Sequence, residues 1–295
     1  MNNDYLATVR KIVQILPIIE KKNEFALKGG TAWNLFYDAL PRLSLDIDLV
    51  YLPINERRES LHQINLMLKD IGNEVTRVMN HDFIFIEGKS KLLIKTRGLN
   101  IKIEPNIVIR GSLYGSVNKE IDINAQDVLE LHTSMNCLTP EEIIGGKVIA
   151  SIDRQHPRDL FDMSRIMNLY DLEDAKIMNA IFFYILQSNR PVYELLNPNE
   201  KYIEEIYNNQ FAGLTKSVIS LDELLLTRKR IIAFMQNEFL KKFRSEILEF
   251  IITKGESLSE HKSFKQYPGI QWKIMNLTKT SQKKLDTEIN SIKQL

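Results

Sequence analysis

The stretch that most constrains this chain runs from Phe25 to Leu52 and contains the pattern Asp46-Ile47-Asp48. It reads as a short strand, a glycine turn, a helix and a second strand. Because a strand turns successive side chains to opposite faces, Asp46 and Asp48 share one face, about 7 Å apart. Paired carboxylates repel each other unless a cation lies between them, and hard oxygen ligands suit Mg²⁺. The pattern therefore predicts a metal site, against the alternative of a solvated strand end.

The turn before the predicted helix is rich in glycine, as many phosphate-binding turns are. Gly29 and Gly30 let backbone N–H groups face outward at a helix N-terminus, where phosphate binds readily. Thr31 follows as a helix cap or a phosphate contact, and Ser44 shares the face of the two aspartates. We therefore expect these four residues to bind a nucleotide.

A later strand supplies a candidate for a third acid. In the segment 99–109, Ile101 and Ile103 point to one face, and Glu104 points to the other. We expect Glu104 to be a third metal ligand, with alternating charge on a half-exposed strand as the alternative. Pro105 is expected to end regular strand pairing, because proline has no N–H group.

The sequence pattern KGGTAWNLFY…RLSLDIDL resembles that of the nucleotidyltransferases of the DNA polymerase β superfamily, and within this superfamily that of the AbiEii/AbiGii abortive-infection toxins. Thr31 stands where that superfamily usually has serine. The resemblance covers most of the chain and is sharpest at 28–49 and 157–162. It implies transfer of an NMP from an NTP to an acceptor, with Mg²⁺ or Mn²⁺ as cofactor. A tRNA 3′ end is the acceptor that related proteins suggest, in a toxin–antitoxin or phage-defence system.

The same resemblance points to residues outside the first stretch. Lys91, Thr96 and Arg97 match a Lys…Thr-Arg motif, which implies nucleotide or RNA binding; a charged edge strand is the alternative. Lys147 in GGKVIASIDR and Asp159 in HPRDLFD match a helix lysine and a later aspartate, which implies catalytic roles with Asp46 and Asp48. For Asp159, a carboxylate that stabilises a helix N-terminus is the alternative.

The pattern of elements predicts an α+β chain. We expect a nucleotidyltransferase-like domain over 1–170, with a mixed sheet and flanking helices, and a helical domain over 171–295. One helix is expected to end at Gly72, followed by a strand over 75–79. Capping boxes are expected at Thr139 to Glu142 and at Ser220 to Glu223. Gly145 and Gly146 suggest close approach of another chain or a ligand.

Composition narrows the function classes. The chain has 295 residues and a formal net charge of +1, so its overall charge does not indicate nucleic-acid binding. Seven lysines after residue 260 form a candidate basic surface, with a merely solvated face as the default alternative. Asp162 is expected to pair with Arg158 or Arg165 at the surface. Single Cys137 excludes an intrachain disulfide, and the five histidines lack zinc-ligand spacing. Without a signal peptide or a membrane-length apolar run, we expect a cytoplasmic protein.

Other readings stay open at this point. The acceptor could be a protein hydroxyl instead of RNA. The fold could also serve only to bind a nucleotide or an antitoxin protein without catalysis, because fold alone does not establish function.

Overall fold

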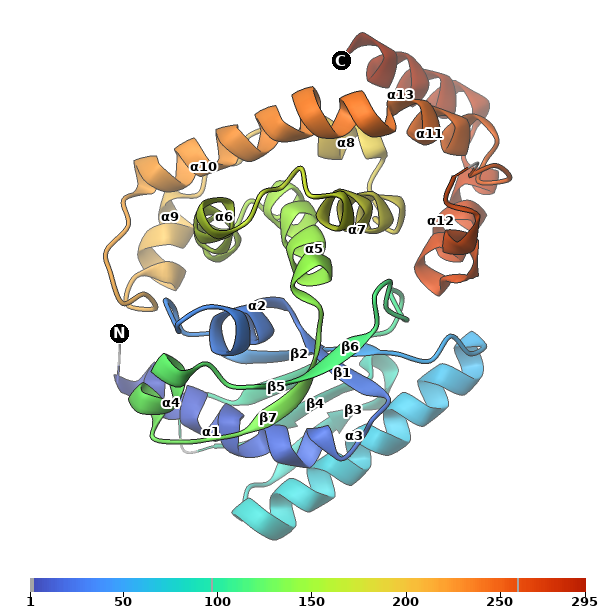
Figure 1. The fold of residues 1–295 in the computed structure, drawn as a ribbon. Coiled ribbons are helices and arrows are strands. Elements are labelled where there is room, and N and C mark those ends of the chain that lie inside the picture. The colour runs from blue at the N-terminus through green and yellow to red at the C-terminus, as the bar shows by residue number, and fades with distance from the viewer. Residues whose placement is uncertain (1–2, 97, 259) are drawn as a thin grey trace. The chain divides into compact units, whose positions relative to one another are not determined.

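The computed structural model describes residues 3–96, 98–258 and 260–295 (Figure 1). Contacts within the chain divide it into two compact units. Unit 1 contains Met1–Ile143 and Phe211–Val218, and unit 2 contains Ile144–Gln210 and Ile219–Leu295. These units are defined by contacts between residues and not by function. The assignment of functional domains to 1–170 and 171–295 stays a prediction. Among the described helices, none is long and apolar enough to span a membrane.

Unit 1 is built on a mixed sheet, in which seven strands are described, in the order β3-β4-β5-β2-β1-β7-β6. β2 pairs antiparallel with β1 and parallel with β5, and β1 pairs parallel with β7. In Figure 1, α1 (Asn3–Glu20) and α3 (Arg57–Met79) lie on one side of the sheet and α2 (Gly29–Ala32) lies on the other. The strands are β1 (Phe25–Lys28), β2 (Asp46–Tyr51), β3 (Phe83–Ile86), β4 (Lys91–Ile94), β5 (Ile101–Asn106), β6 (Ser116–Glu120) and β7 (Ser134–Leu138).

The helices of unit 1 flank this sheet, and α5 crosses the boundary between the units. Unit 1 contains α1 (Asn3–Glu20), α2 (Gly29–Ala32), the π-helical turn η1 (Trp33–Tyr37), α3 (Arg57–Met79), the 3₁₀ turn η2 (Glu87–Lys89) and α4 (Ile123–Leu129), followed by α5 (Pro140–Asp153). Unit 2 continues with α6 (Pro157–Leu169), α7 (Ala175–Leu186), α8 (Val192–Leu196), α9 (Glu204–Ile206), α10 (Leu221–Phe234), η4 (Met235–Phe239), α11 (Leu240–Ile252), η5 (Lys262–Gln266), α12 (Pro268–Lys279) and α13 (Gln282–Gln294). The π-helical turn η3 (Tyr207–Phe211) begins in unit 2, and its last residue belongs to unit 1. The expected α+β class is confirmed.

The central strands show the expected alternation. Ile47 on β2 and Ile101 and Ile103 on β5 are fully buried. The prediction that Pro105 ends the pairing is wrong, because β5 pairs with β2 as far as Asn106. On its other side, β5 pairs with β4 only from Ile101 to Ile103. Pro105 therefore lies beyond the last paired residue of β4, so its missing N–H group removes no hydrogen bond to that strand.

The helix expected to end at Gly72 continues to Met79, so the predicted strand over 75–79 is wrong. Val75 is fully buried and extends the apolar stripe of α3. A Cβ atom at Gly72 would lie 2.8 Å from ring carbons of Phe83. The absence of a side chain at Gly72 therefore leaves room for the aromatic ring of Phe83. Asn80, with φ 53°, ends the helix instead.

The start of α5 also differs from the prediction. The hydroxyl of Thr139 has no hydrogen-bond partner, so the expected capping box is wrong. Glu142 accepts bonds from the Ser112 hydroxyl at 2.6 Å and the amides of Leu113 and Tyr114 at 3.1 and 3.2 Å. This buried carboxylate fixes the loop after β5. The second predicted capping box, at Ser220 and Glu223, is confirmed.

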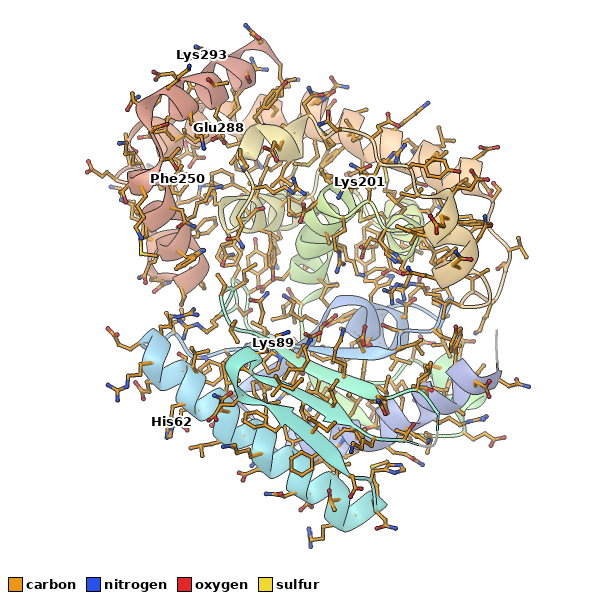
Figure 2. The ribbon with its side chains drawn as sticks, turned by 180° about the vertical axis from the view of Figure 1, so that it is seen from behind. His62, Lys89, Lys201, Phe250, Glu288 and Lys293 are labelled. Carbon is orange, nitrogen blue, oxygen red and sulfur yellow. The ribbon has the colours of Figure 1, made fainter. Side chains whose placement is uncertain are left out.

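Unit 2 is held by packed helices with an aromatic core. Phe182 on α7 and Phe243 on α11 stack with ring centroids 4.5 Å apart. Figure 2 labels Phe250, which is fully buried on α11, and Glu288 on α13. The Glu288 carboxylate accepts a 2.6 Å bond from the amide of Val192, which begins α8. The packing thus extends to the C-terminal helix.

The two glycines of α5 give a matched test of this packing. A Cβ atom at Gly145 would lie 2.7 Å from backbone and side-chain carbons of Ala180, whereas one at Gly146 would lie 3.6 Å from the Tyr184 ring. Gly145→Ala should lower the free energy of unfolding by about 1–2 kcal/mol through overpacking. Gly146→Ala should raise it by up to about 1 kcal/mol through helix propensity. Urea denaturation measures both, and equal effects of the two substitutions would contradict the packing described.

Candidate active site

Three of the four predicted acidic residues meet on one face of the unit 1 sheet. In the strand register, Asp48 on β2 lies between Lys28 on β1 and Glu104 on β5. Asp46 is paired with Lys102 in the same register. The sheet thus brings Asp46, Asp48 and Glu104 together from separate parts of the sequence, and we call the face that carries them the acidic face. Sequence reasoning missed Lys102, because a lysine on a half-exposed strand carries no local signal of its own.

Two lysines lie against these acids. The Lys102 ammonium is 3.0 Å from Glu104 Oε2 and 3.5 Å from Asp46 Oδ1, and Lys91 on β4 pairs with Glu104 Oε1. Burial favours a higher pKa for Glu104, but the bonds from Lys91 and Lys102 hold that pKa below its ordinary value. Burial likewise opposes the charge of Lys102, yet the contacts with Glu104 and Asp46 raise its pKa overall. Both partners therefore stay charged at neutral pH.

The glycine turn packs directly against the aspartates and Ser44. Gly29 has φ 70°, in the left-handed region, and a Cβ atom there would lie 2.7 Å from Asp48 Oδ2. A Cβ atom at Gly30 would lie 2.9 Å from the Ser44 hydroxyl and 2.8 Å from Arg42 Nη2. The predicted nucleotide-binding turn and the acidic strand therefore form one continuous surface.

Thr31 and Arg42 support this surface from inside. Thr31 is fully buried, and its hydroxyl donates to the backbone carbonyl of Asp46. This bond ties the helix start to the first residue of β2, so Thr31 positions Asp46. Arg42 is also buried, and its Nη1 donates to the Leu43 carbonyl at 3.0 Å. Arg42 was not among the predicted site residues, although its place two residues before Ser44 in the motif was a usable signal.

The residues of the Lys…Thr-Arg motif do not all lie at the acidic face. Lys91 belongs to the acidic face, as described above. Thr96 follows β4, and its hydroxyl donates to the Leu99 carbonyl at 2.8 Å and accepts from the Gly98 amide at 3.1 Å. Thr96 therefore shapes the turn between β4 and β5. Arg97 lies outside the described residues.

Lys147 and Asp159 belong to a buried ion cluster within unit 2. The Lys147 ammonium is 3.4 Å from Asp159 Oδ1 and 2.5 Å from Asp162 Oδ2. Arg154 approaches Asp159 at 2.8 Å. The expectation that Asp162 pairs at the surface is wrong, because its side chain is fully buried against Lys147. One turn of α6 separates Asp159 from Asp162, so both carboxylates reach the same lysine on α5.

The metal prediction can be tested against the donors present. Among the residues that the structure describes, no group of three or more His, Cys, Asp or Glu side chains is arranged to hold a metal ion. Asp46 and Asp48 still fit Mg²⁺, which often binds through one or two carboxylates and takes its other ligands from phosphate and water. The role of Glu104 as a third ligand stays a prediction.

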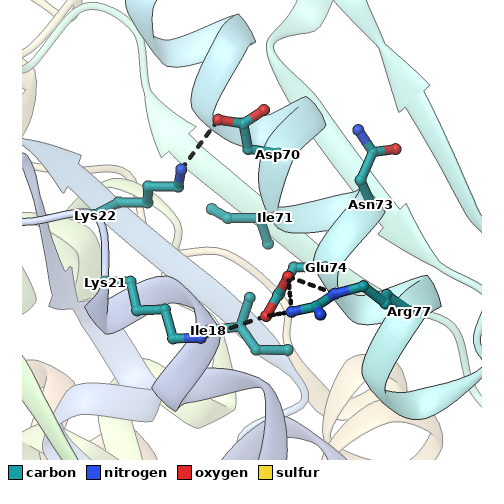
Figure 3. Close-up of a pocket in the computed structure, with 8 residues that line it drawn as sticks. All are labelled: Ile18, Lys21, Lys22, Asp70, Ile71, Asn73, Glu74 and Arg77. Atoms are coloured by element: carbon teal, nitrogen blue, oxygen red, sulfur yellow. Dashed lines mark hydrogen bonds and ion pairs between the residues drawn. The ribbon is translucent and has the colours of Figure 1, made fainter.

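A pocket of about 520 Å³ lies elsewhere in unit 1, between α1 and α3 (Figure 3). Its charged side chains pair with one another: Lys22 with Asp70 at 3.0 Å, and Glu74 with both Lys21 and Arg77. None of the predicted site residues lines it. We therefore place the candidate site at the acidic face.

The ion cluster of unit 2 predicts a stability effect. Lys147→Met leaves two buried carboxylates without their shared ammonium, a loss that typically costs about 3–5 kcal/mol. The double variant Lys147→Met/Asp162→Asn should recover part of this loss, since Asp159 keeps Arg154. Chemical denaturation followed by circular dichroism measures both, with the exposed Lys229→Met as control. An unchanged stability of Lys147→Met would contradict the cluster.

Comparison with known proteins agrees with this fold. A search of curated proteins finds no match. Among solved structures, the chain is similar to MenT4, a nucleotidyltransferase toxin from Mycobacterium tuberculosis H37Rv, with a TM-score of 0.63 and 13% sequence identity over 93% of each chain. At that identity, the likeness shows the fold alone.

A family model gives the more specific result. The model, described as nucleotidyl transferase AbiEii toxin of type IV toxin–antitoxin systems, matches residues 11–231. This range is well over half of the chain and contains the glycine turn, the acidic face and the ion cluster of unit 2. The chain therefore belongs to the AbiEii toxin family and is a nucleotidyltransferase.

Proposed function

We propose that this enzyme transfers an NMP group from an NTP to a hydroxyl of an RNA acceptor, the 3′ end of a tRNA. In this proposal the protein is the toxin of a toxin–antitoxin or phage-defence pair, and a cognate antitoxin restrains it. The observation that carries the proposal is the packing of the Gly29-Gly30 turn against Asp48 and Ser44. A glycine turn next to paired carboxylates suits a metal-bound polyphosphate.

Asp46 and Asp48 would hold Mg²⁺ or Mn²⁺. Such an ion neutralises phosphate charge and lowers the pKa of an attacking hydroxyl. The donor set of two carboxylates leaves room for phosphate oxygens as further ligands. Thr31 contributes indirectly, because its bond to the Asp46 carbonyl fixes the strand that carries both aspartates.

The remaining residues of the acidic face would orient the nucleotide. The amides of the glycine turn and the Ser44 hydroxyl donate to phosphate oxygens, and Arg42 adds positive charge beside Gly30. The acceptor oxygen forms a bond to the α-phosphorus while the bond from the α-phosphorus to the bridging oxygen breaks. Pyrophosphate leaves with the electrons of the broken bond, and the acceptor hydroxyl gives its proton to solvent.

Lys147 and Asp159 remain proposed catalytic residues, on the motifs that they match. The Lys147 ammonium is held between Asp159 and Asp162, which keeps it charged although it is buried. We propose that Lys147 stabilises the negative charge that develops during transfer.

An RNA acceptor fits the charge of the C-terminal segment. Of its seven lysines, Lys273 is buried and donates to the carbonyls of Ser188 and Arg190, so it serves the fold. Five others are exposed: Lys262, Lys279, Lys283, Lys284 and Lys293. Exposed lysines can neutralise the phosphates of a nucleic-acid backbone.

The acceptor can be identified by incubating the purified chain with Mg²⁺, each labelled NTP, total RNA and total protein. We expect label in the tRNA fraction from one preferred NTP, released from the 3′ end by limited exonuclease digestion. Label confined to protein would instead identify a protein hydroxyl as the acceptor. Absence of label and of pyrophosphate release with all four NTPs would contradict the proposed transfer to either acceptor.

The acidic pair gives the sharpest activity prediction. Asp46→Asn and Asp48→Asn should each lower the rate of pyrophosphate release at least about 100-fold, because each removes a metal-binding charge without changing side-chain size. Asp70→Asn, on the exposed face of α3, is the matched control and should keep wild-type activity. Melting temperatures should agree among the variants. Full activity in either active-site variant would overturn the assignment.

A further inference from the structure

We propose that the segment Phe211–Val218 positions Arg42 and Ser44 for nucleotide binding, although it lies far from both in the sequence. We call this segment the strap, and we call residues 38–45, which join η1 to β2, the site loop. The inference rests on the proposed function, because that function assigns phosphate contacts to Ser44 and Arg42. The strap residues touch the site loop and not the nucleotide, so they are positioning residues.

The strap is a loop between two elements of unit 2 that packs as part of unit 1. The chain leaves unit 2 after Gln210 and returns to it at Ile219. The Tyr207 hydroxyl donates to the Ile219 carbonyl at 2.6 Å, which holds the two ends of the loop together. Phe211 and Leu214 are each only 2% exposed, whereas a loop that merely connects two helices runs over the surface. Two apolar side chains therefore anchor the strap in unit 1.

The strap holds the site loop on both sides of Arg42. Thr215 and Arg42 form an isolated antiparallel bridge. Two backbone hydrogen bonds of 2.9 Å flank this bridge: one from the Leu43 amide to the Leu214 carbonyl, and one from the Lys216 amide to the Pro41 carbonyl. The backbone of Arg42 is thus fixed before and after its own position.

The conformation of the site loop depends on contacts of this kind. Between η1 and β2, the described chain forms no helix or ladder strand, and its one strand-like pairing is the bridge to Thr215. Leu40 has φ 49°, in the left-handed region that a leucine rarely adopts, and its side chain is fully buried. Such a conformation persists only where the surrounding structure fixes it. The strap supplies this support at Pro41 and Leu43.

The support reaches the glycine turn through Arg42 and Ser44. A Cβ atom at Gly30 would lie 2.8 Å from Arg42 Nη2 and 2.9 Å from the Ser44 hydroxyl, so both groups already lie against the turn. Leu43, which lies between them in the sequence, is the residue whose amide binds the strap. Groups that are fixed before a ligand arrives lose less conformational freedom on binding. The strap should therefore lower the KM for the nucleotide.

The first arm of the test measures how firmly the strap holds the site loop. Hydrogen–deuterium exchange of the full chain is followed by mass spectrometry in peptides that cover 38–45. Lys216→Pro removes the amide that binds the Pro41 carbonyl and should speed exchange there at least about fivefold, the loss of one hydrogen bond. Ser217→Pro is the matched control, because the Ser217 amide makes no hydrogen bond among the described residues. Wild-type exchange in Lys216→Pro would overturn the inference.

The second arm measures KM and kcat in the transfer assay. Lys216→Pro should raise the KM for the NTP at least about fivefold and change kcat less than about twofold, because it weakens ground-state and transition-state binding alike. In this background, Ser44→Ala should raise KM by a smaller factor than it does in the wild type, because both substitutions act on the same contact. Ser217→Pro should keep the wild-type KM. A wild-type KM in Lys216→Pro, or effects that simply multiply, would overturn the inference.

A second variant covers the case in which Lys216→Pro does not fold, as judged by circular dichroism. Leu214→Ala shortens a buried anchor of the strap and leaves the backbone bonds possible, so it should raise both exchange and KM in the same direction. Val218→Ala is its control, because Val218 is 96% exposed. Wild-type values of exchange and KM in Leu214→Ala would also overturn the inference.

The two arms separate this inference from the proposed function. If the wild type transfers no NMP, the proposed function is wrong, and the exchange arm still decides whether the strap fixes the site loop. If the wild type transfers NMP and the strap variants keep its KM, the proposed function stands and the role of the strap is wrong.

Discussion

The parallel pairing of β2 with β5 is the constraint on which the rest of the site depends. It sets Asp48 beside Glu104 and Asp46 beside Lys102. The buried residues on the opposite face, among them Ile47 and Ile103, fix this register, because a slip by one residue would turn every charge into the core. The apolar side of the sheet thus determines which charged side chains meet on the other side. Core packing therefore sets the positions of the charged groups on the acidic face.

The glycine turn joins this sheet to nucleotide binding. Gly29 needs its left-handed conformation, and a side chain there would collide with Asp48. Gly30 leaves room for Ser44 and Arg42 in the same way. The turn and the acidic strand are therefore one structural element, although the η1 turn and a loop separate them in sequence. Substitution of either glycine would displace the groups that would contact a phosphate, so their small size serves the site and not only the backbone.

Sequence patterns predicted what depends on local periodicity. Strand alternation placed Asp46, Asp48 and Glu104 on one face, and helix capping rules found Ser220. The sequence patterns gave wrong predictions where contact with a residue far away in the sequence determines the local structure. Gly72 reads as a helix end until the Phe83 ring is known to pack on it, and Asp162 reads as a surface residue until Lys147 is seen beside it. Lys102 acquires a role only through its neighbours across β2 and β4, which no local pattern records.

The most direct test is a crystal structure of the full chain with Mn²⁺ and a non-hydrolysable NTP, with the metal located by its anomalous scattering. This account predicts a Mn²⁺ peak within bonding distance of Asp46 and Asp48, with phosphate oxygens on the Gly29-Gly30 amides. A bound nucleotide whose Mn²⁺ lies away from both aspartates would contradict it.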